Sequence, residues 1–293
     1  VGTTGGEFTV SADGTDAAIT PTNIAIKRQS SYGSANVDAQ PAGNATLFLQ
    51  RARRKIRELA YNFDVDGYQA ADLTILNDTV TTSGINEMAY QQSPDSILWC
   101  VRDDGVLSGL TYQRAEQVTA WHRHILGGVF GSGNAVVESV ATISGSLNED
   151  ELWVIVKRTI NGATKRYVEC FADFDFDETT STDFRFLDSH LTYDGSATTT
   201  LSGLTHLEGQ SVSILADGAA HANKTVSSGA ITLDRSVTKA VVGLSYDSVL
   251  QTMRIEGGAA EGTSQGKTKR ISKVVLRLFE TVGVKVGPSL TNL

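Results

Sequence analysis

The sequence predicts an all-β protein: part of a β-propeller with a small β-barrel or sandwich module inserted into it. The first observation is a cassette of an apolar run, a turn and a second run ending in tyrosine, which occurs three times. Its aromatic residues are Phe48, Trp99 and Trp153, and its tyrosines are Tyr61, Tyr112 and Tyr167. The second observation is that 28 glycines against 4 prolines favour strands joined by tight turns. A strand–turn–strand unit recurring about every 50 residues is typical of propeller blades.

Each cassette is predicted to be a β-hairpin. Asp103-Asp104-Gly105 and Asn161-Gly162 separate the runs of the second and third cassettes, and such pairs favour hairpins because both residues accept a positive φ. The first cassette carries Arg53-Arg54-Lys55 instead, and its run Leu47 to Tyr61 is rich in helix formers. Alone this run would predict an amphipathic helix. The repeat predicts a hairpin here as well.

Shorter strand-like runs lie between the hairpins and bring each unit to about four strands, as in a propeller blade. We expect them at 7–10, 24–26, 72–76, 118–125 and 136–143. Residues 1–30 already have a strand pattern, so we expect a further blade upstream of Val1.

The composition changes near residue 194. Residues 194–203 are rich in Ser, Thr and Gly and predict a linker. Short alternating runs follow and predict a small barrel or sandwich; they are 211–215, 224–226, 230–233, 239–244 and 249–255. Strand patterns resume at 274–278 and 282–287. The predicted domains are propeller blades at 1–193, incomplete at the N-terminus, an inserted module with linkers at 194–260, and return strands to the propeller at 261–293.

The bulk properties exclude several classes. The net charge of −8 gives no general attraction to nucleic acid or anionic membranes. No apolar run approaches the roughly 18 residues of a transmembrane helix. Cys100 and Cys170 lie in apolar runs and are predicted to be buried thiols.

Three further segments carry residue types that occur in binding sites. His122 and His124 share one face of a predicted strand, with Trp121 and Arg123 on the other, but no third metal ligand is marked nearby, so an exposed blade edge is predicted. Residues 173–178 alternate Asp and Phe and are predicted to be a strand, with a calcium loop as the alternative. Residues 127–133 are Gly-rich without a phosphate-loop lysine and predict a mobile inter-strand loop.

One basic cluster stands out, and it falls on the first hairpin turn. Its members are Arg51, Arg53, Arg54, Lys55 and Arg57. At a hairpin tip it would meet an acidic neighbouring subunit or a phosphate backbone, or it would be a solvated turn that protects a sheet edge. The sequence assigns no catalytic residue, no cofactor and no metal ligand.

Several stretches resemble the nozzle protein of short-tailed bacteriophages, also called tail tubular protein B. They are Asn44–Arg51, Asp66–Thr74, Asp104–Tyr112, Trp121–His124 and Gly203–Gly209. The resemblance covers nearly the whole chain. It implies a non-enzymatic, propeller-bearing virion subunit that is made in the host cytoplasm and forms a homo-oligomeric ring, a hexamer, at the distal tail.

The resemblance also implies contacts with other tail proteins and a channel through which genomic DNA leaves without sequence recognition. An acidic chain suits such a channel, because each neutralised phosphate would add affinity and friction. Members of the family are longer, so we expect missing flanks. Two alternatives remain open: an adhesin-like module that binds glycan or a tail protein, and a propeller glycosidase with convergent carboxylates.

Overall fold

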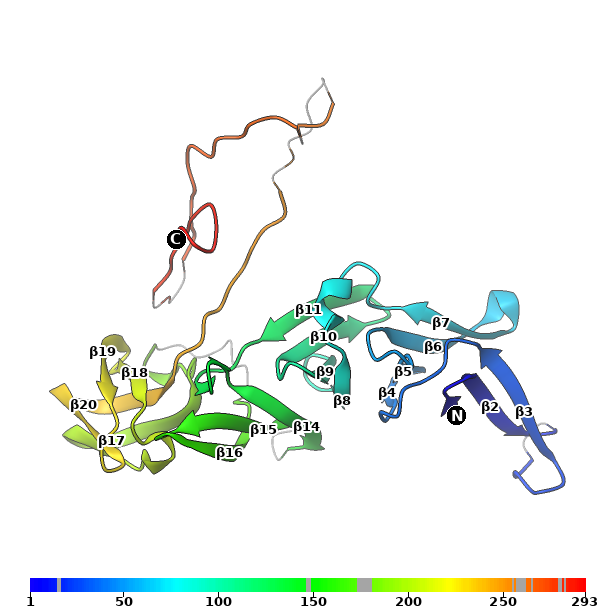
Figure 1. Ribbon diagram of the computed structural model, residues 1–293, viewed down its shortest axis with the longest axis horizontal. Coiled ribbons are helices and arrows are strands. Elements are labelled where there is room, and N and C mark those ends of the chain that lie inside the picture. The colour runs from blue at the N-terminus through cyan, green and yellow to red at the C-terminus, as the bar shows by residue number, and fades with distance from the viewer. Residues whose placement is uncertain are drawn as a thin grey trace. The chain divides into compact units, whose positions relative to one another are not determined.

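The computed structural model of the chain describes residues 1–14, 17–145, 149–172, 181–254, 256, 262–264, 266–278, 281 and 283–293. These residues form an all-β protein, which confirms the predicted class (Figure 1). The strands are β1 (Gly2–Thr3), β2 (Gly6–Ala12), β3 (Ile24–Ser30), β4 (Gln40–Ala42), β5 (Ala45–Leu49), β6 (Ile56–Asn62), β7 (Gly67–Asp72), β8 (Ile85–Gln91), β9 (Ile97–Arg102), β10 (Leu107–Gln113), β11 (Val118–His124), β12 (Val129–Phe130), β13 (Gly133–Asn134), β14 (Val136–Ser144), β15 (Asp150–Ile160), β16 (Ala163–Cys170), β17 (Asp188–Ser202), β18 (Ser211–Ala216), β19 (Ala219–Thr225) and β20 (Ala230–Leu244). Short 3₁₀ helices are η1 (Phe63–Val65), η2 (Asp78–Thr81), η3 (Ser181–Asp183) and η4 (Thr205–Leu207).

The chain divides into two compact units, Val1–Asp175 with His206–Gln210, and Phe176–Thr205 with Ser211–Leu293. Unit 1 holds three antiparallel meanders that we call sheet I (β4-β5-β6-β7), sheet II (β8-β9-β10-β11) and sheet III (β14-β15-β16). It also holds the N-terminal sheet β1-β2-β3 and the small hairpin β12-β13, which occupies the Gly-rich segment expected to be a loop. Four-stranded meanders are the units from which propellers are built, while closure into a propeller stays a prediction.

All three cassettes form the predicted hairpins, β5-β6, β9-β10 and β15-β16. Asn161 and Gly162 both have positive φ, 49° and 72°, and form a two-residue turn between paired Ile160 and Ala163. Gly105, with a φ of 79°, ends the turn of the second hairpin. In the first hairpin Arg53 takes the left-handed conformation, with a φ of 59°.

Tertiary packing overrides the helical preference of residues 47–61. In the extended conformation Leu47 and Leu49 point to one face of sheet I and are almost fully buried, together with Ile56 across the hairpin. Burying a leucine or isoleucine side chain stabilises the fold by roughly 1.5–3 kcal/mol, whereas helix propensities differ by only about 0.7 kcal/mol per residue. The free energy gained by burying these side chains therefore exceeds the helical preference, and the segment forms strands.

Sheet II lies between sheets I and III and buries both of its faces. Along β9, Leu98 and Cys100 join the core shared with sheet I, while Trp99 and Val101 join the core shared with sheet III. This alternation is the period of two expected of a strand with two covered faces.

The turns of the first two hairpins each accept a backbone hydrogen bond from the first strand of the following sheet. The amide of Ile85, the first residue of β8, donates to the carbonyl of Arg53 at 2.9 Å. One sheet later the amide of Val137 in β14 donates to the carbonyl of Gly105, again at 2.9 Å. Both donors and both acceptors are 52 residues apart, so the sequence repeat corresponds to a repeated contact in which each hairpin tip holds the first strand of the following sheet.

The fold of unit 2 differs from the predicted module. Its sheet, which we call the module sheet, has the order β17-β20-β18-β19 and is not closed into a barrel within the described residues. The predicted linker at 194–203 is wrong, because residues 194–202 belong to β17 and include the buried Leu201. β-branched threonines favour strands as well as loops, which explains the error. The predicted runs 230–233 and 239–244 are one strand, β20, and 249–254 form none.

Among the described residues beyond β20 there is no strand, and this includes 274–278, which were expected to form one (Figure 1). The run 72–76, expected to be a strand, is the end of β7 followed by a turn. The predicted division into 1–193, 194–260 and 261–293, with return strands in the last part, stays a prediction.

Candidate functional site

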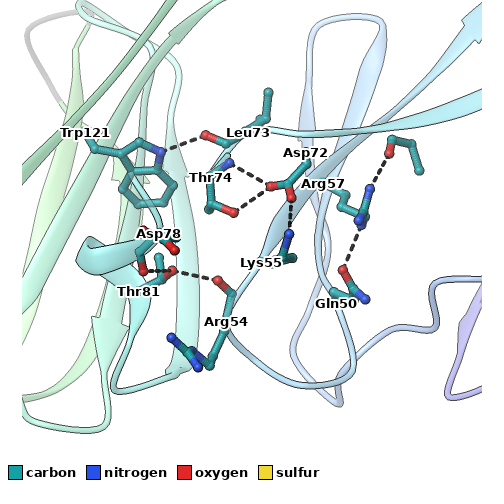
Figure 2. Close-up of polar contacts among 11 residues, drawn as sticks. Gln50, Arg54, Lys55, Arg57, Asp72, Leu73, Thr74, Asp78, Thr81 and Trp121 are labelled. Atoms are coloured by element: carbon teal, nitrogen blue, oxygen red, sulfur yellow. Dashed lines mark hydrogen bonds and ion pairs between the residues drawn. The ribbon is translucent and has the colours of Figure 1, made fainter. Parts of the chain in front are cut away.

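The basic cluster lies on the first hairpin, as predicted, but three of its side chains, Arg53, Lys55 and Arg57, bind partners within the chain, and Arg57 is buried. Lys55 donates to Asp72 at 2.6 Å, and the amide and hydroxyl of Thr74 donate to the same carboxylate (Figure 2). Burial alone would raise the pKa of Asp72, but the hydrogen bonds from Lys55 and Thr74 outweigh it and hold this pKa below its usual value. Lys55, just before β6, therefore binds the last residue of β7, the outer strand of sheet I.

Arg57 is buried and structural. Its Nε donates to Gln50 Oε1 at 2.8 Å and one terminal nitrogen donates to the carbonyl of Ala70 at 2.7 Å (Figure 2). Its guanidinium lies 3.4 Å from the centre of the Tyr32 ring, a cation–π contact. This side chain cannot meet an external phosphate.

The hairpin tip joins sheet I to sheet II. Arg53 forms an ion pair with Asp103 and donates to Asn86 Oδ1 at 2.7 Å. The hydroxyl of Thr81 donates to the carbonyl of Arg54 at 2.6 Å (Figure 2).

A second contact lies across the same junction. Trp121 Nε1 in β11 donates to the carbonyl of Leu73, just after β7, at 2.9 Å (Figure 2).

Two members of the basic cluster, Arg51 and Arg54, are exposed and form no ion pair with the described residues. The hairpin tip that carries the cluster thus contacts the next sheet, and the two exposed cations are available to bind an anion. What the exposed pair meets, an acidic neighbouring subunit, a phosphate backbone or solvent alone, stays a prediction.

The histidine pair forms a second candidate site, at the edge strand β11. His122 Nδ1 and His124 Nε2 lie 2.7 Å apart, so one ring donates to the other. The Trp99 ring packs against both, with centroid distances of 5.7 and 5.1 Å, and Phe171 lies 6.3 Å from His124. Gly109 leaves the space that the His122 ring occupies, because an added Cβ would collide with it.

The two histidines share a face, as predicted, but they are half-buried rather than exposed, while Arg123 is exposed. Burial, followed by the proximity of His122, lowers the pKa of His124 to about 4, and burial lowers that of His122. No group of three or more His, Cys, Asp or Glu side chains is placed to hold a metal ion in the part of the chain that the structure describes.

The low pKa of His124 predicts acid sensitivity. In the unfolded chain its pKa is near 6.5, so the unfolded state binds a proton first and stability decreases as the pH falls from about 6.5 toward 4. We expect the free energy of unfolding to fall by about 2 kcal/mol between pH 7.5 and pH 5 from this group. Urea denaturation at both pH values measures it.

The matched variants separate this effect from general acid denaturation. His124→Phe should flatten the pH dependence in that window, whereas Arg123→Gln, at the exposed neighbouring position, should keep it. Equal slopes in both variants would contradict the assignment.

Unit 2 carries an apolar pocket of about 440 Å³ against the module sheet. Its lining residues are Phe184, Phe186, Leu187, Ser213, Ile214, Leu215, Ala220 and Thr281. The rings of Phe184 and Phe186 lie 5.3 Å apart, and Phe186 is 57% exposed. The sequence marks this region only by its aromatic run, which gave no functional prediction.

The structure also bears on the predictions for the two cysteines, the acidic run 173–178 and membrane-spanning segments. Cys100 is buried as predicted, but Cys170, at the end of an edge strand, is exposed. The acidic run 173–178 lies outside the described residues. The described helices are 3₁₀ turns, and none is long enough to span a bilayer.

No protein-family model matches the chain, and no curated protein matches it either.

Proposed function

We propose that this chain is a non-enzymatic structural subunit of a bacteriophage tail, of the nozzle type, that forms a ring around the exit channel for genomic DNA. The observation that carries the proposal is the coincidence of the resembling stretches with the sheet junctions. Residues 44–51 form β5 and lead into the first tip, and 66–74 form β7 and the turn that contacts Trp121. Residues 104–112 form the second tip and β10.

The distribution of charge supports a passage rather than a DNA-binding surface. Proteins that hold DNA place unpaired Lys and Arg against phosphates. In the basic cluster Arg53, Lys55 and Arg57 are engaged within the protein. With a net charge of −8, such a surface lets DNA pass without sequence recognition.

The proposed setting is the distal tail of the virion, with six copies in the ring and other tail proteins as neighbours. Purified protein is expected to form rings with a central channel in electron micrographs, and antibodies against it should label the tail tip of particles. Monomers under all conditions, together with unlabelled particles, would refute the proposal.

A second candidate function is recognition of glycan or another tail protein by unit 2. The apolar pocket favours it, since its volume is in the range of ligand sites and its exposed phenylalanine is suited to an apolar side chain. Glycan arrays and pull-downs with tail proteins test it, comparing the wild type with Phe186→Ala. An absence of binding in both assays would exclude this function.

A further inference from the structure

The histidine pair on β11 has the arrangement of a two-ligand chelate. His122 and His124 are two positions apart on one strand, so both rings lie on the same face of sheet II. Their nearest nitrogens, His122 Nδ1 and His124 Nε2, are 2.7 Å apart. Both side chains are half-buried, so each keeps part of its surface in solvent. Imidazole nitrogen is a common ligand of zinc, copper and nickel ions in proteins.

The distance between the two nitrogens selects among these ions. With metal–nitrogen bonds of about 2.0–2.1 Å, two ligands at a right angle are about 2.9 Å apart, whereas two ligands of a tetrahedral ion are about 3.3 Å apart. The 2.7 Å between the two imidazoles is closer to the first value. Right angles between neighbouring ligands belong to square-planar and octahedral sites, which suit Cu²⁺ and Ni²⁺. Zn²⁺, which prefers a tetrahedral site, would require the two rings to move apart.

The residues around the pair hold the two rings in this arrangement. The Trp99 ring packs against both imidazoles, and Gly109 leaves the space for the ring of His122. Thr111 Oγ1 lies 3.3 Å from His122 Nε2 and can accept a hydrogen bond from it, which leaves the Nδ1 lone pair for a metal. Ligands that are held in place before binding reduce the entropy that metal binding costs.

We propose that His122 and His124 form a binding site for a divalent transition-metal ion, with Cu²⁺ preferred to Ni²⁺ and Ni²⁺ preferred to Zn²⁺. The metal takes the place of the proton between the rings, and His124 then carries its own proton on Nδ1. Among the described residues no third His, Cys, Asp or Glu side chain completes the site, so water fills the remaining positions. Copper binds most tightly because divalent ions follow this general order at nitrogen ligands, whereas geometry decides between nickel and zinc.

Metal titration of the full chain, prepared without a histidine tag, tests the site. Calorimetric titration with CuCl₂, NiCl₂ and ZnCl₂ should give a single tight Cu²⁺ site, with Ni²⁺ bound more tightly than Zn²⁺. His122→Gln and His124→Gln should each weaken Cu²⁺ binding by roughly tenfold or more, because a chelate loses the effective concentration of its second ligand. The matched control Arg123→Gln changes the residue between them, on the opposite face, and should bind Cu²⁺ as the wild type does.

A spectroscopic measurement on the wild type makes the test independent of how the variants fold. The electron paramagnetic resonance spectrum of the bound Cu²⁺ should show two coordinated imidazole nitrogens. Equal Cu²⁺ affinity in the wild type and the His122→Gln/His124→Gln double variant, or a spectrum without imidazole nitrogen, would place the ion elsewhere and overturn the proposal. So would the absence of binding for all three ions. Zn²⁺ bound as tightly as Ni²⁺ would contradict the selection by geometry.

The acid sensitivity predicted for His124 is a property of the metal-free protein, so the urea denaturation that measures it is carried out with EDTA. The metal site does not depend on the proposed tail function, because it rests on β11 and the side chains packed against it.

Discussion

Replacing Arg158 by methionine should destabilise unit 1 by about 3–5 kcal/mol, because it leaves a partly buried carboxylate without its cation. Arg158 is fully buried in β15. Its two terminal nitrogens bind the two oxygens of Glu169 at 2.5 and 3.0 Å, and its Nε donates to the carbonyl of Gly127 at 2.8 Å. Urea denaturation at neutral pH measures the loss.

The double variant Arg158→Met/Glu169→Met is the matched control. Removing both charges takes away the uncompensated carboxylate, so most of the stability should return. If the double variant were as unstable as the single one, the loss would come from packing and not from the unpaired charge.

Replacing Gly105 by alanine should cost about 2–4 kcal/mol and weaken the contact between sheets II and III. Its φ of 79° disfavours any side chain, and an added Cβ would lie 2.6 Å from Val136 Cγ1. The first strand of sheet III would have to move away from the tip that holds it. Thermal denaturation and amide exchange at Val137 report the two effects.

Gly162→Ala separates backbone strain from this collision. Gly162 has a similar φ, 72°, on a hairpin turn, but an added Cβ there has nothing within 4 Å. We expect a loss of about 1 kcal/mol, from the left-handed conformation alone. Equal losses at the two glycines would mean that the tip does not hold the next sheet.

Structure could be predicted from the sequence where the turn residues, the alternating apolar runs and the repeat indicate the same element. The turn at Asn161-Gly162 and the hairpins around Trp99 and Trp153 could be predicted, since turn residues and alternating apolar runs act over a few neighbours. At 47–61 the repeat gave the right answer against local propensity. At 194–203 no repeat was available, and threonines that suit both loops and strands led to the wrong assignment.

The environment of the candidate sites could not be predicted in the same way. Alternation placed His122 and His124 on one face, but their burial comes from Trp99 and Phe171, which lie on other segments. Likewise the basic run predicted an exposed tip, yet Arg57 turns inward to Gln50 and Ala70. Such contacts depend on tertiary neighbours that no spacing within a run reveals.

The position of sheet II between its neighbours has a consequence for how the protein responds to stress. Leu98 and Trp99 are adjacent in sequence yet belong to different cores, so withdrawing β9 would open both at once. Local opening would therefore be confined to the outer sheets, and the middle one would open only with the whole unit. A protein built this way opens first at its outer sheets, while the middle sheet keeps its two neighbours in place until the whole unit unfolds.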